Sequence, residues 1–468
     1  MDARLISLTI IAATIGCADA PSSSSEAEVK ECTSCIRWVH EFGPDSLTSP
    51  LVSALAAGNK GTFVIGGRTS GEEDDFGCGA VQTTDHAAFV ARFTSSGECA
   101  WHHELLPTGQ PDWSSRAETK AIGVDAEGRV IIAADVNYNV DAGNGELPPA
   151  GSDPDAAELL LAQYDSKGKL RWAKRFGAKT TQGSPRLTPT ALAIGADGDI
   201  FVAGLHAWAA SFDDHDLPSD GSAFVARFSA DGDVRWAKEA GSEVRITALT
   251  VTEDDRVVAV GTVGDYGVVG GSGSHSVFGK TIEVPAGADA NLLVASLTAT
   301  GKASWVTGFS AIEPHVTPSP GADGKTVAVD ADGSIVVGGT LSGRITIGDE
   351  ELAPAEEEGY ASYVARFGSD GTPIGGFALQ DRSEVRLASD GDGVRAVSGS
   401  EDSGLFIGRL SESGLGQEKS AKSAHTTVQE LSATSNGSLL MLVAVGTKGG
   451  KAFGRTLHRG QAALIYRP

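Results

Sequence analysis

Residues Ser222–Gly241, SAFVARFSADGDVRWAKEAG, show the pattern on which the rest of the chain is built. Apolar side chains recur at every second position up to Phe228, and this period of two predicts a half-buried strand. Asp231-Gly232 then predicts a tight two-residue turn, because glycine accepts the positive φ that such a turn requires. The residues after the turn predict a second strand, so the segment reads as a β-hairpin.

The same hairpin recurs along the chain. Copies occupy Ala87–Trp101, Leu159–Trp172, Leu292–Trp305 and Ser362–Gly376, and weaker copies occupy Leu405–Gln417 and Ala462–Pro468. A second hairpin precedes each copy, and Pro189–Leu205 is its clearest form. Each unit therefore has four antiparallel strands, here called A to D in chain order. Seven such units predict an all-β fold, a seven-bladed β-propeller of four-stranded blades.

The two ends of the chain predict how the ring closes. The last unit ends with its C strand, Ala462–Arg467, and has no D strand. The first strand-like segment, Ile36–Phe42, reads as a D strand with no C strand before it. Joining the two fragments completes the seventh blade and removes two exposed sheet edges. We therefore expect the N-terminal strand to be the outer strand of the C-terminal blade.

Tryptophan recurs on the predicted D strands, and in four units a glycine precedes it by four residues. The tryptophans are Trp38, Trp101, Trp172, Trp236 and Trp305, and the glycines are Gly97, Gly168, Gly232 and Gly301. Aromatic residues at repeat spacing are typical of packing between blades rather than of a stacking platform for a ligand. The repeat copies at Ser362–Gly376, Leu405–Gln417 and Ala462–Pro468 lack the tryptophan.

These motifs carry a resemblance to a known family. The combination of A-x-D-x-x-G-x-I-x-V-A-G, F-V-A-R-F and G-x-x-x-W-x-x-x-x-G resembles the bacterial propeller repeats often called SBBP. It is also similar to the tryptophan-docking repeats of quinoprotein propellers. The resemblance covers Ile36 to Pro468 and implies the fold rather than an activity. A quinone cofactor is implied by likeness alone, since no loop residues can be named as its ligands.

The first residues predict an export signal. An apolar run, Leu5–Ile15, follows Arg4 and is shorter than the roughly 20 residues that a membrane-spanning helix needs. Thr14-Ile15-Gly16-Cys17 resembles the lipobox of bacterial lipoproteins, in which the cysteine is lipidated. An ordinary secretory signal with an incidental cysteine is the alternative. We expect a signal peptide at 1–16, lipidated Cys17 and a flexible tether at 17–35, and a propeller at 36–468. The resemblance implies a lipid-anchored protein of the bacterial cell envelope, facing the periplasm or the exterior.

Four further cysteines follow Cys17, namely Cys32, Cys35, Cys78 and Cys99. An even number in an exported protein predicts disulfides, and three pairings are possible. A redox Cys-x-x-Cys belongs on a βαβ framework, which this sequence lacks, and a zinc ribbon needs two such knuckles. Structural disulfides are therefore the expectation.

Charge and composition exclude some classes of partner. The 468 residues include 37 basic and 61 acidic side chains, a formal charge of −24. Nucleic acid is not expected as a partner, because phosphate binding needs a basic surface. The same charge argues against a bare anionic membrane surface, so contact with a membrane is expected only through the lipid anchor. The 60 glycines fit a fold with many tight turns, and no long segment has the apolar period of a helix.

Antiparallel alternation predicts two unlike faces. The A–B and C–D turns are short and share one face, whereas the B–C and D–A connections are long and share the other, here called the long-loop face. Loop variation on a rigid scaffold is how binding sites usually arise, so any binding surface is expected on the long-loop face. The link from Ser400 to Leu405 is short and predicts a notch there.

Acidic clusters occur in the long loops, at Glu72–Asp75, Asp213–Asp216, Asp349–Glu351 and Glu356–Glu358. Asp213, Asp214, His215 and Asp216 form the strongest metal candidate, with ligands suited to calcium or zinc. Solvated surface charge is the favoured interpretation for all four clusters, and a cation site or a docking surface for basic partners is the alternative. No cofactor is predicted from the residues, and a bound calcium ion is the exception that such a cluster would allow. The repeated Asp-x-Asp-Gly, as in Asp330–Gly333, is explained by turn chemistry and lacks the ligands of an EF-hand.

Three functions follow as hypotheses. The first is a non-enzymatic, monomeric binding scaffold that is tethered to a membrane and takes a protein or glycan on the long-loop face. The second is an enzyme, such as a glycan lyase, a hydrolase or a quinone-dependent dehydrogenase, with its site at the axial mouth. The third is an assembly factor for envelope proteins. Alanines on the A strands, at Ala54, Ala191, Ala248 and Ala328, favour binding over catalysis.

Overall fold

The Ser222–Gly241 segment forms two antiparallel strands, β16 (Ser222–Phe228) and β17 (Val234–Gly241). The prediction of a two-residue turn is wrong. The Gly232 N–H donates to Ser229 O at 2.9 Å, and the Ser229 N–H donates to Asp233 O at 2.8 Å. Within this turn Gly232 alone has a positive φ, of 82°. Glycine therefore follows a right-handed turn and forms a bulge before β17 begins.

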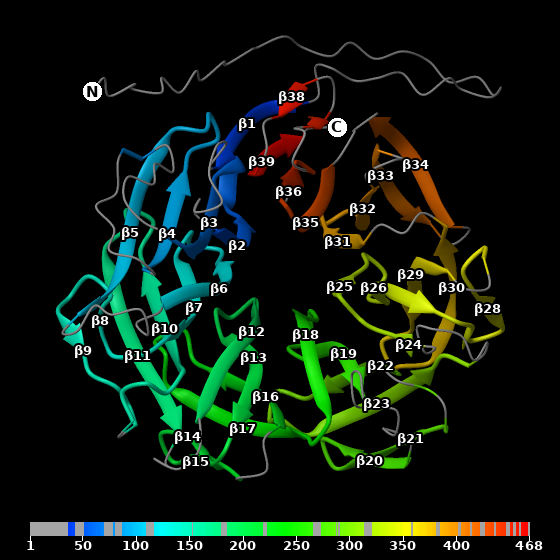
Figure 1. The fold of residues 1–468 in the computed structure, drawn as a ribbon, viewed down its shortest axis with the longest axis horizontal. Coiled ribbons are helices and arrows are strands. Elements are labelled where there is room, and N and C mark those ends of the chain that lie inside the picture. The colour runs from blue at the N-terminus through cyan, green and yellow to red at the C-terminus, as the bar shows by residue number, and fades with distance from the viewer. Residues whose placement is uncertain are drawn as a thin grey trace.

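The computed structural model arranges seven such sheets in a ring (Figure 1), which confirms the predicted all-β propeller. The structure describes residues 36–42, 51–69, 78–79, 87–108, 117–151, 153–178, 185–218, 222–264, 273–286, 288, 291–312, 321–356, 359–380, 384–400, 404–411, 414–421, 426–434, 437–445, 450–452, 455–457 and 460–466. Within these residues the one helical segment is a 3-10 turn, η1 (Asn59–Gly61). No helix in the described part of the chain has the length and hydropathy to span a membrane.

Each blade has four antiparallel strands in the order A to D from the axis outward. The A strands are β2 (Leu51–Ala57), β6 (Ala117–Val124), β12 (Arg186–Ile194), β18 (Val244–Val251), β25 (Thr326–Val329), β31 (Val385–Ser389) and β35 (Thr426–Ala433). The B strands are β3 (Phe63–Arg68), β7 (Val130–Val136), β13 (Ile200–Ala207), β19 (Val257–Val263), β26 (Ile335–Ser342), β32 (Val394–Ser400) and β36 (Leu439–Val445).

The outer half of each blade follows the same order. The C strands are β4 (Ala88–Phe93), β10 (Glu158–Tyr164), β16, β22 (Asn291–Leu297), β29 (Tyr360–Phe367), β33 (Gly404–Ser411) and β39 (Gly460–Tyr466). The D strands are β5 (Cys99–Thr108), β11 (Leu170–Ala178), β17, β23 (Ala303–Ser310), β30 (Pro373–Leu379), β34 (Gly414–Ala421) and β1 (Ile36–Phe42). A short strand, β24 (Gly321–Ala322), also pairs with β26. Blades are numbered 1 to 7 in the order of their A strands.

The chain ends meet in one sheet, as the sequence predicts. Strand β1 pairs antiparallel with β39, with Val39 opposite Leu464, and the seventh sheet has the order β1-β39-β36-β35. Figure 1 shows the blue N-terminal strand beside the red C-terminal strand. The N-terminal strand thereby covers the edge of β39 and completes the ring.

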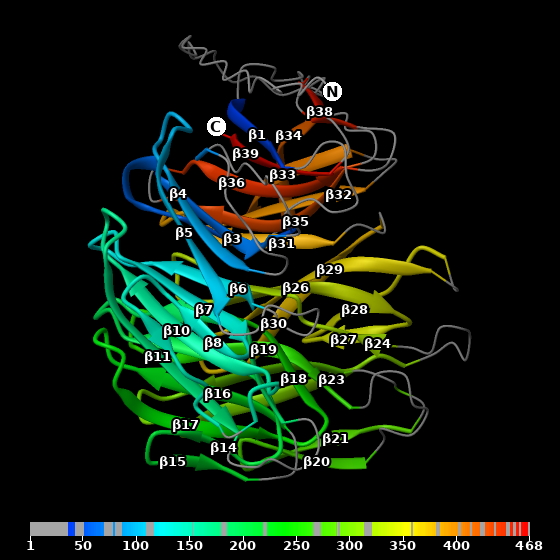
Figure 2. The ribbon, with the colours of Figure 1, turned by 60° about the vertical axis from the view of Figure 1, so that its left-hand side comes forward.

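The long B–C connections are not simple loops. They contain five added hairpins: β8 (Asn139–Asp141) with β9 (Glu146–Leu147), β14 (Ala210–Phe212) with β15 (His215–Leu217), β20 (Gly273–Val277) with β21 (Lys280–Val284), β27 (Ile345–Ile347) with β28 (Glu350–Leu352), and β37 (Gly450–Ala452) with β38 (Arg455–Leu457). Strand β8 pairs with β5, and β14 pairs with β11, so each extends the sheet of the preceding blade to six strands. In Figure 1 the labelled strands β9, β14, β15, β20, β21 and β28 lie at the outside of the ring, and Figure 2 shows β14, β15, β20 and β21 at its lower edge.

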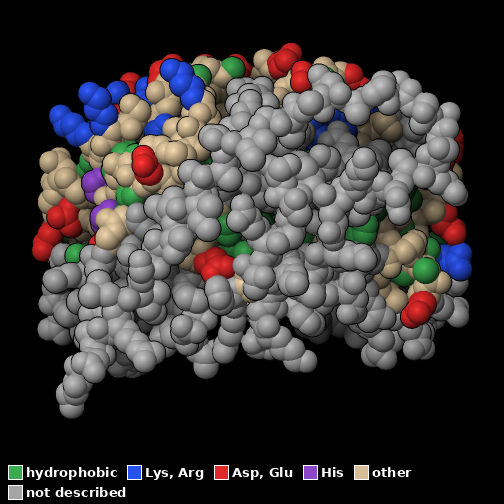
Figure 3. All heavy atoms as spheres, turned by 90° about the horizontal axis from the view of Figure 1, so that it is seen from above, with side chains coloured by type: hydrophobic (Ala, Val, Ile, Leu, Met, Phe, Trp, Pro, Cys, Tyr) green, Lys and Arg blue, Asp and Glu red, His purple; other side chains and the backbone are tan. Residues whose placement is uncertain are grey.

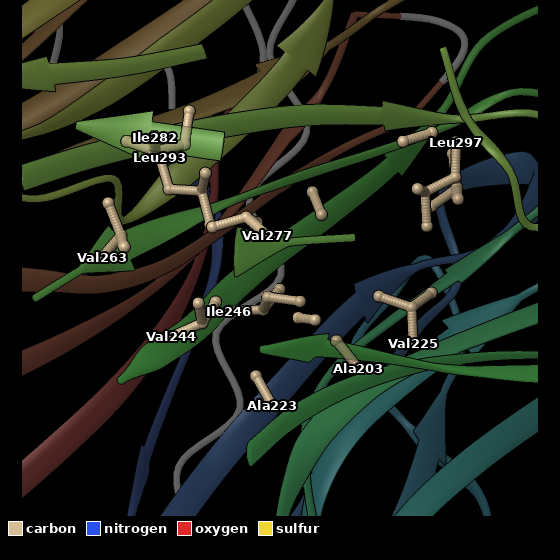
Figure 4. Close-up of a cluster of buried hydrophobic side chains, with 14 of the residues drawn as sticks. Ala203, Ala223, Val225, Val244, Ile246, Val263, Val277, Ile282, Leu293 and Leu297 are labelled. Carbon is tan, nitrogen blue, oxygen red and sulfur yellow. The ribbon is translucent and has the colours of Figure 1, made fainter. Parts of the chain in front are cut away.

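The hydrophobic core lies between neighbouring blades. Figure 4 shows one cluster, in which Ala203 and Val225 of blade 3 pack near Ile246 and Leu293 of blade 4. Val277 and Ile282 of the same cluster come from the β20–β21 hairpin and not from a blade strand. The added hairpins therefore contribute buried apolar surface as well as hydrogen bonds.

Tryptophan packs between blades, as expected, but its glycine partner is in the next blade. The indole N–H groups of Trp101, Trp172, Trp236 and Trp305 donate to Ser166 O, Ala230 O, Ala299 O and Ser369 O at 3.3, 3.2, 2.9 and 3.2 Å. Gly168, Gly232, Gly301 and Gly371 lie against the rings of the same four tryptophans. Gly371 thus contacts the ring of Trp305 in the preceding blade, although the D strand of its own blade has no tryptophan. Trp38 lies on β1, and its side chain is outside the described residues.

Candidate functional site

Five of the seven axial strands carry a bulge, and the bulged residues Ser53, Thr190 and Thr247 bond the next blade. A bulge sits at Ser53, Lys120, Thr190, Thr247 and Gln429. Ser53 Oγ donates to Glu118 of the next blade at 2.6 Å, and Thr190 Oγ1 donates to Ile246 O at 2.7 Å. The bulge turns a polar side chain toward the neighbouring A strand, which would otherwise have an unpaired edge.

The axis is not lined by small residues alone. The inner strands carry the four expected alanines, Ala54, Ala191, Ala248 and Ala328. Ala54, Ala191 and Ala328 are buried in hydrophobic clusters between blades and Ala248 packs against such a cluster, so the expectation that they line the axis is wrong. Blades 2, 5 and 6 carry acid–base pairs near the start of the inner strand. Lys120 lies 2.7 Å from Glu118, Lys325 lies 3.2 Å from Asp323, and Arg386 lies 2.6 Å from Glu384.

Two carboxyl groups of this axial region have pKa values shifted in opposite directions. Burial raises the pKa of Glu430 above its usual range, and the charge of Glu384 adds to this, whereas Arg386 opposes it. Burial also acts on Glu118, but hydrogen bonds from Lys120 and Ser53 outweigh burial and hold its pKa below the usual range. The axial pairs therefore neutralise one another, and Glu430 is the group most inclined to keep a proton.

A crevice of about 520 Å³ opens at the rim between blades 2 and 3. It is lined by Ala150, Gly151, Arg175, Phe176, Gly177, Ala178, Ser211 and Asp213. Its walls come from the end of β11, the hairpin β14–β15 and the loop before β10. The hairpin and the loop belong to B–C connections and the D strand β11 ends at a D–A connection, so the crevice belongs to the long-loop face. Its volume is within the range of small-molecule sites.

A buried ion pair supports the floor of this crevice. Arg175 Nε lies 2.8 Å from Glu158 Oε2, with the two side chains 4% and 0% exposed. The N–H groups of Ala150 and Gly151 donate to the same carboxylate at 2.9 and 2.7 Å. Burial lowers the pKa of the Arg175 guanidinium, and the charge of Glu158 partly offsets this. The loop is thereby fixed over the end of β11. Neither residue belongs to a motif that the sequence analysis identified.

The sequence-predicted metal candidates lie at the tip of β14–β15. Asp213 has a φ of 52°, in the left-handed region, and lines the rim crevice, whereas Asp216 accepts a hydrogen bond from Ser211 Oγ at 2.9 Å. Among the described residues, the one set of three His, Cys, Asp or Glu ligand atoms within 4.8 Å of one another is Cys78, Cys99 and His102. The fold therefore does not gather the four residues of the tip around one point.

Cys78 and Cys99 form a disulfide, which is one of the bonds that the sequence allowed. It joins the first long B–C connection to the outer strand β5. Cys17, Cys32 and Cys35 lie outside the described residues, as do the signal peptide and the tether. The acidic segment at 72–75 lies outside them too.

Most of the exposed large apolar side chains of the described residues lie on one face. Among the described residues, the large hydrophobic side chains that are exposed are Leu51, Trp208, Ile312, Tyr360 and Ile374. Leu51 begins an A strand and Ile312 follows a D strand, so both lie at D–A connections. Trp208 follows a B strand and Tyr360 begins a C strand, so both lie at B–C connections. All four positions are therefore on the long-loop face. Ile374 alone lies beside a C–D turn on the opposite face.

Two of these side chains share one corner of the molecule. The Ile312 N–H donates to Arg344 O at 2.8 Å, and Ser342, two residues earlier, pairs with Tyr360. Ile312 is 57% exposed and Tyr360 is 44% exposed. A patch of this kind on a folded surface is typical of a contact region for a partner.

The described B–C connections of blades 2, 3 and 5 are mostly acidic. Asp141, Glu146, Asp153, Asp155, Asp213, Asp214, Asp349, Glu350 and Glu351 lie in the B–C connections of blades 2, 3 and 5. Arg344 is the one basic residue in those three connections, and it pairs with Glu351 at 2.9 Å. Figure 3 views one edge of the ring, where described Lys and Arg side chains gather mainly in one corner and Asp and Glu side chains are spread along the margins.

On the opposite face, arginine side chains form hydrogen bonds with residues of the turns. A second crevice, of about 490 Å³, includes Asp199, Arg227 and Trp236. Arg227 Nε donates to Asp199 at 2.7 Å, and Arg227 Nη1 donates to Ala299 O of the next blade at 2.9 Å. The acidic turn residues therefore serve structure, as the sequence predicts, and the arginine of the F-V-A-R-F motif is their partner.

The chain matches no family model and no curated protein. Its fold is similar to that of virginiamycin B lyase from Staphylococcus aureus, at 11% identity and a TM-score of 0.43, over 92% of this chain and 98% of that chain. It is also similar to a chain of the mitotic checkpoint complex, at 11% identity and a TM-score of 0.48, over 100% and 99%. The WD40 repeats of RRP9 give 11% identity and a TM-score of 0.48, over 94% and 99%. These likenesses concern the fold alone.

Proposed function

We propose that this protein is an extracytoplasmic binding scaffold, tethered to a membrane through Cys17, that takes a protein or glycan on its long-loop face. One observation carries the proposal: four of the five exposed large hydrophobic side chains of the described residues lie on that face. Apolar anchors within a polar rim are the usual composition of a docking surface. Because the described B–C connections of blades 2, 3 and 5 are mostly acidic, a protein partner would present basic residues.

A pair of matched substitutions tests the face. Ile312 and Ile374 are equally exposed, at 57%, but lie on opposite faces. Purified protein carrying Ile312→Ser or Ile374→Ser would be crosslinked to an envelope extract beside the unchanged protein. We expect Ile312→Ser to lose the crosslinked species and Ile374→Ser to keep them. Equal loss in both variants, or loss in Ile374→Ser alone, would assign binding elsewhere.

The proposed membrane tether is inferred from the sequence alone and is tested separately from the binding face. The Thr14-Ile15-Gly16-Cys17 segment supports lipidation at Cys17, and the polar residues after it support a flexible linker. Mass spectrometry of the mature N-terminus should find a lipid-modified Cys17 as the first residue. An unmodified chain that begins at another residue would remove the anchor from the proposal and leave the binding face untouched.

An enzyme at the axial mouth is the second candidate. Glu430 favours it, because a carboxyl group whose pKa is raised beside other charged groups is typical of acid–base catalysts. Lyase or hydrolase activity on envelope glycans should then disappear in Glu430→Gln. Full activity in that variant would place the chemistry elsewhere, and no turnover by the unchanged protein would favour the scaffold.

A further inference from the structure

One tryptophan does not have the structural role of the others. The described side chains include those of Trp101, Trp172, Trp236 and Trp305, whose indole N–H groups donate to carbonyl groups of the next blade. Trp208 follows strand β13 on the long-loop face and is 42% exposed. Its indole N–H has no hydrogen-bond partner among the described residues. The ring of Trp208 therefore does not join two blades.

The backbone of Trp208 has an unfavourable conformation. Its φ is 69°, in the left-handed region, where a bulky residue is an outlier and glycine is not. Blade 5 has a glycine at the corresponding position: Gly343, with a φ of 85°, follows Gly339 by four residues, as Trp208 follows Gly204. A Cβ atom at Gly204 or at Gly339 would meet a carbonyl oxygen of the paired A strand, which marks these two glycines as equivalent. The fold therefore accepts glycine here, and a strained side chain in its place is typical of a recognition residue.

The strained residue is fixed on both sides. His206 Nδ1 lies 3.1 Å from Trp208 O, and the histidine side chain is fully buried. Two residues after Trp208, Ala210 of β14 pairs with Ala178 of β11. The ring is therefore carried by an ordered backbone, which reduces the conformational entropy that binding would cost.

An exposed arginine lies beside this tryptophan. Arg186, at the start of β12, is opposite Ala207, the residue before Trp208, in the register of the sheet. The Leu187 N–H donates to Ala157 O at 2.8 Å and holds the backbone of this strand end. The guanidinium of Arg186 has no ion pair or hydrogen bond among the described residues. An aromatic ring and a set of N–H donors therefore lie at neighbouring positions.

These two side chains select the class of ligand. The apolar face of an indole suits the ring of a sugar, and the indole and guanidinium N–H groups can donate to its hydroxyl oxygens. Asp213 and Asp214 are exposed in the same B–C connection and would repel a polyanionic glycan. Among the described residues, blades 2 and 3 have no other large hydrophobic side chain that is exposed, so the apolar core of a protein interface is missing here.

We propose that Trp208 and Arg186 form a binding site for a neutral glycan, in which a sugar ring stacks on the indole and its hydroxyl oxygens accept hydrogen bonds from the guanidinium. This inference rests on the proposed scaffold function and places its glycan ligand on blade 3. The apolar corner at Ile312 and Tyr360 is a separate contact region.

Calorimetric titration of the purified protein tests the site. The ligands are the neutral trisaccharides cellotriose, maltotriose and mannotriose, with trigalacturonate as the anionic comparison. At least one neutral trisaccharide should bind, and more tightly than trigalacturonate does. Trp208→Gly should weaken that binding by about 10-fold or more, because the stacking ring is lost. Trp208→Tyr should bind better than Trp208→Gly, because it keeps an aromatic ring.

Controls separate binding from folding. Glycine suits the left-handed backbone, so Trp208→Gly should unfold as cooperatively as the unchanged protein does. Arg186→Gln should also weaken binding, because the guanidinium donors are lost. Arg171→Gln, at another exposed arginine, on the outer strand β11, should bind as the unchanged protein does.

Three results would overturn the inference: no binding of any neutral trisaccharide, tighter binding of trigalacturonate, or unchanged affinity in Trp208→Gly. If Ile312→Ser still loses the crosslinked species while no sugar binds, the scaffold function stands and this glycan site does not. If a sugar binds through Trp208 but crosslinking is insensitive to Ile312→Ser, the glycan site stands and the apolar corner is not the docking surface.

Discussion

Both a positive φ and a close indole ring require glycine in four C–D turns, at Gly168, Gly232, Gly301 and Gly371. Gly232 has a φ of 82°, which a side chain disfavours, and a Cβ atom there would lie 2.9 Å from the ring of Trp172. Gly333, in the A–B turn between β25 and β26, has almost the same φ, of 81°, but nothing within 4 Å of the position of a Cβ atom. The pair therefore separates the backbone requirement from the inter-blade contact.

We expect Gly333→Ala to lower the free energy of unfolding by about 1–2 kcal/mol, the usual penalty for a left-handed alanine. Gly232→Ala should cost about 1–3 kcal/mol more, because overpacking against Trp172 is added to the backbone penalty. Denaturant unfolding of both variants measures the difference. Equal losses would show that the indole does not press on the glycine.

Asp390 predicts a pH dependence of stability. Burial raises the pKa of its carboxyl group, but hydrogen bonds from Arg395 and from the Asp392 N–H, together with the charges of Arg409 and Arg395, outweigh burial and lower the pKa. A carboxyl group whose folded pKa lies below its unfolded value stabilises the protein above the unfolded value. That contribution is lost as the pH falls below about 4.

Asp390→Asn should therefore lower the free energy of unfolding at pH 7, since Arg395 and Arg409 lose a charged partner. The difference from the unchanged protein should shrink between pH 5 and the acid limit. Denaturant unfolding at several pH values measures this. A difference that grows on acidification would contradict the assigned direction of the pKa shift.

Residue roles were only partly predictable. The spacing of glycine and tryptophan within a unit is visible in the sequence, but which blade supplies the partner depends on the ring. Gly371 shows this, because it lacks a tryptophan in its own unit and contacts Trp305 of the preceding blade. No sequence motif reveals the ion pair of Arg175 and Glu158, because the two residues lie on neighbouring strands and meet only through the register of the sheet.

Hairpins inserted in the B–C connections act as part of the core. Phe212 on β14 is fully buried, and its ring centroid lies 5.3, 5.2 and 6.0 Å from those of Phe176, Phe224 and Phe228. The sequence analysis treated this segment as a variable loop with an acidic tip. Its alternation of Ala210 and Phe212 is too short to distinguish a strand from a loop, so pairing with β11 was not predictable.

Phe212→Ala should cost about 3–5 kcal/mol, as expected for a large core side chain, although the residue lies in an insertion. Asp214→Asn, two residues along, should leave stability unchanged because its side chain is exposed. Chemical denaturation compares the two. A loss below 1 kcal/mol in Phe212→Ala would mean that the hairpin is not part of the folded unit.

At the scale of the whole molecule, closure of the ring determines which strand connections lie on each of the two faces. The number of units, the strand order and the joining of the two chain ends were all predictable, because the repeat count leaves one C strand and one D strand without partners. The binding surface was predictable only as a face. Its crevice and apolar corner depend on residues of adjacent blades, and sequence distance does not show which of them meet.

Closure is tested most directly by a cysteine pair across the first and last strands. Glu41 of β1 lies opposite Ala462 of β39, whereas Ala378 lies on the outer strand of blade 5. Mild oxidation of the Glu41→Cys, Ala462→Cys protein should give an intramolecular disulfide by peptide mass spectrometry, and the Glu41→Cys, Ala378→Cys protein should give none. If the first pair links only between molecules, or not at all, the chain ends do not share a blade and the assignment of the long-loop face fails with them.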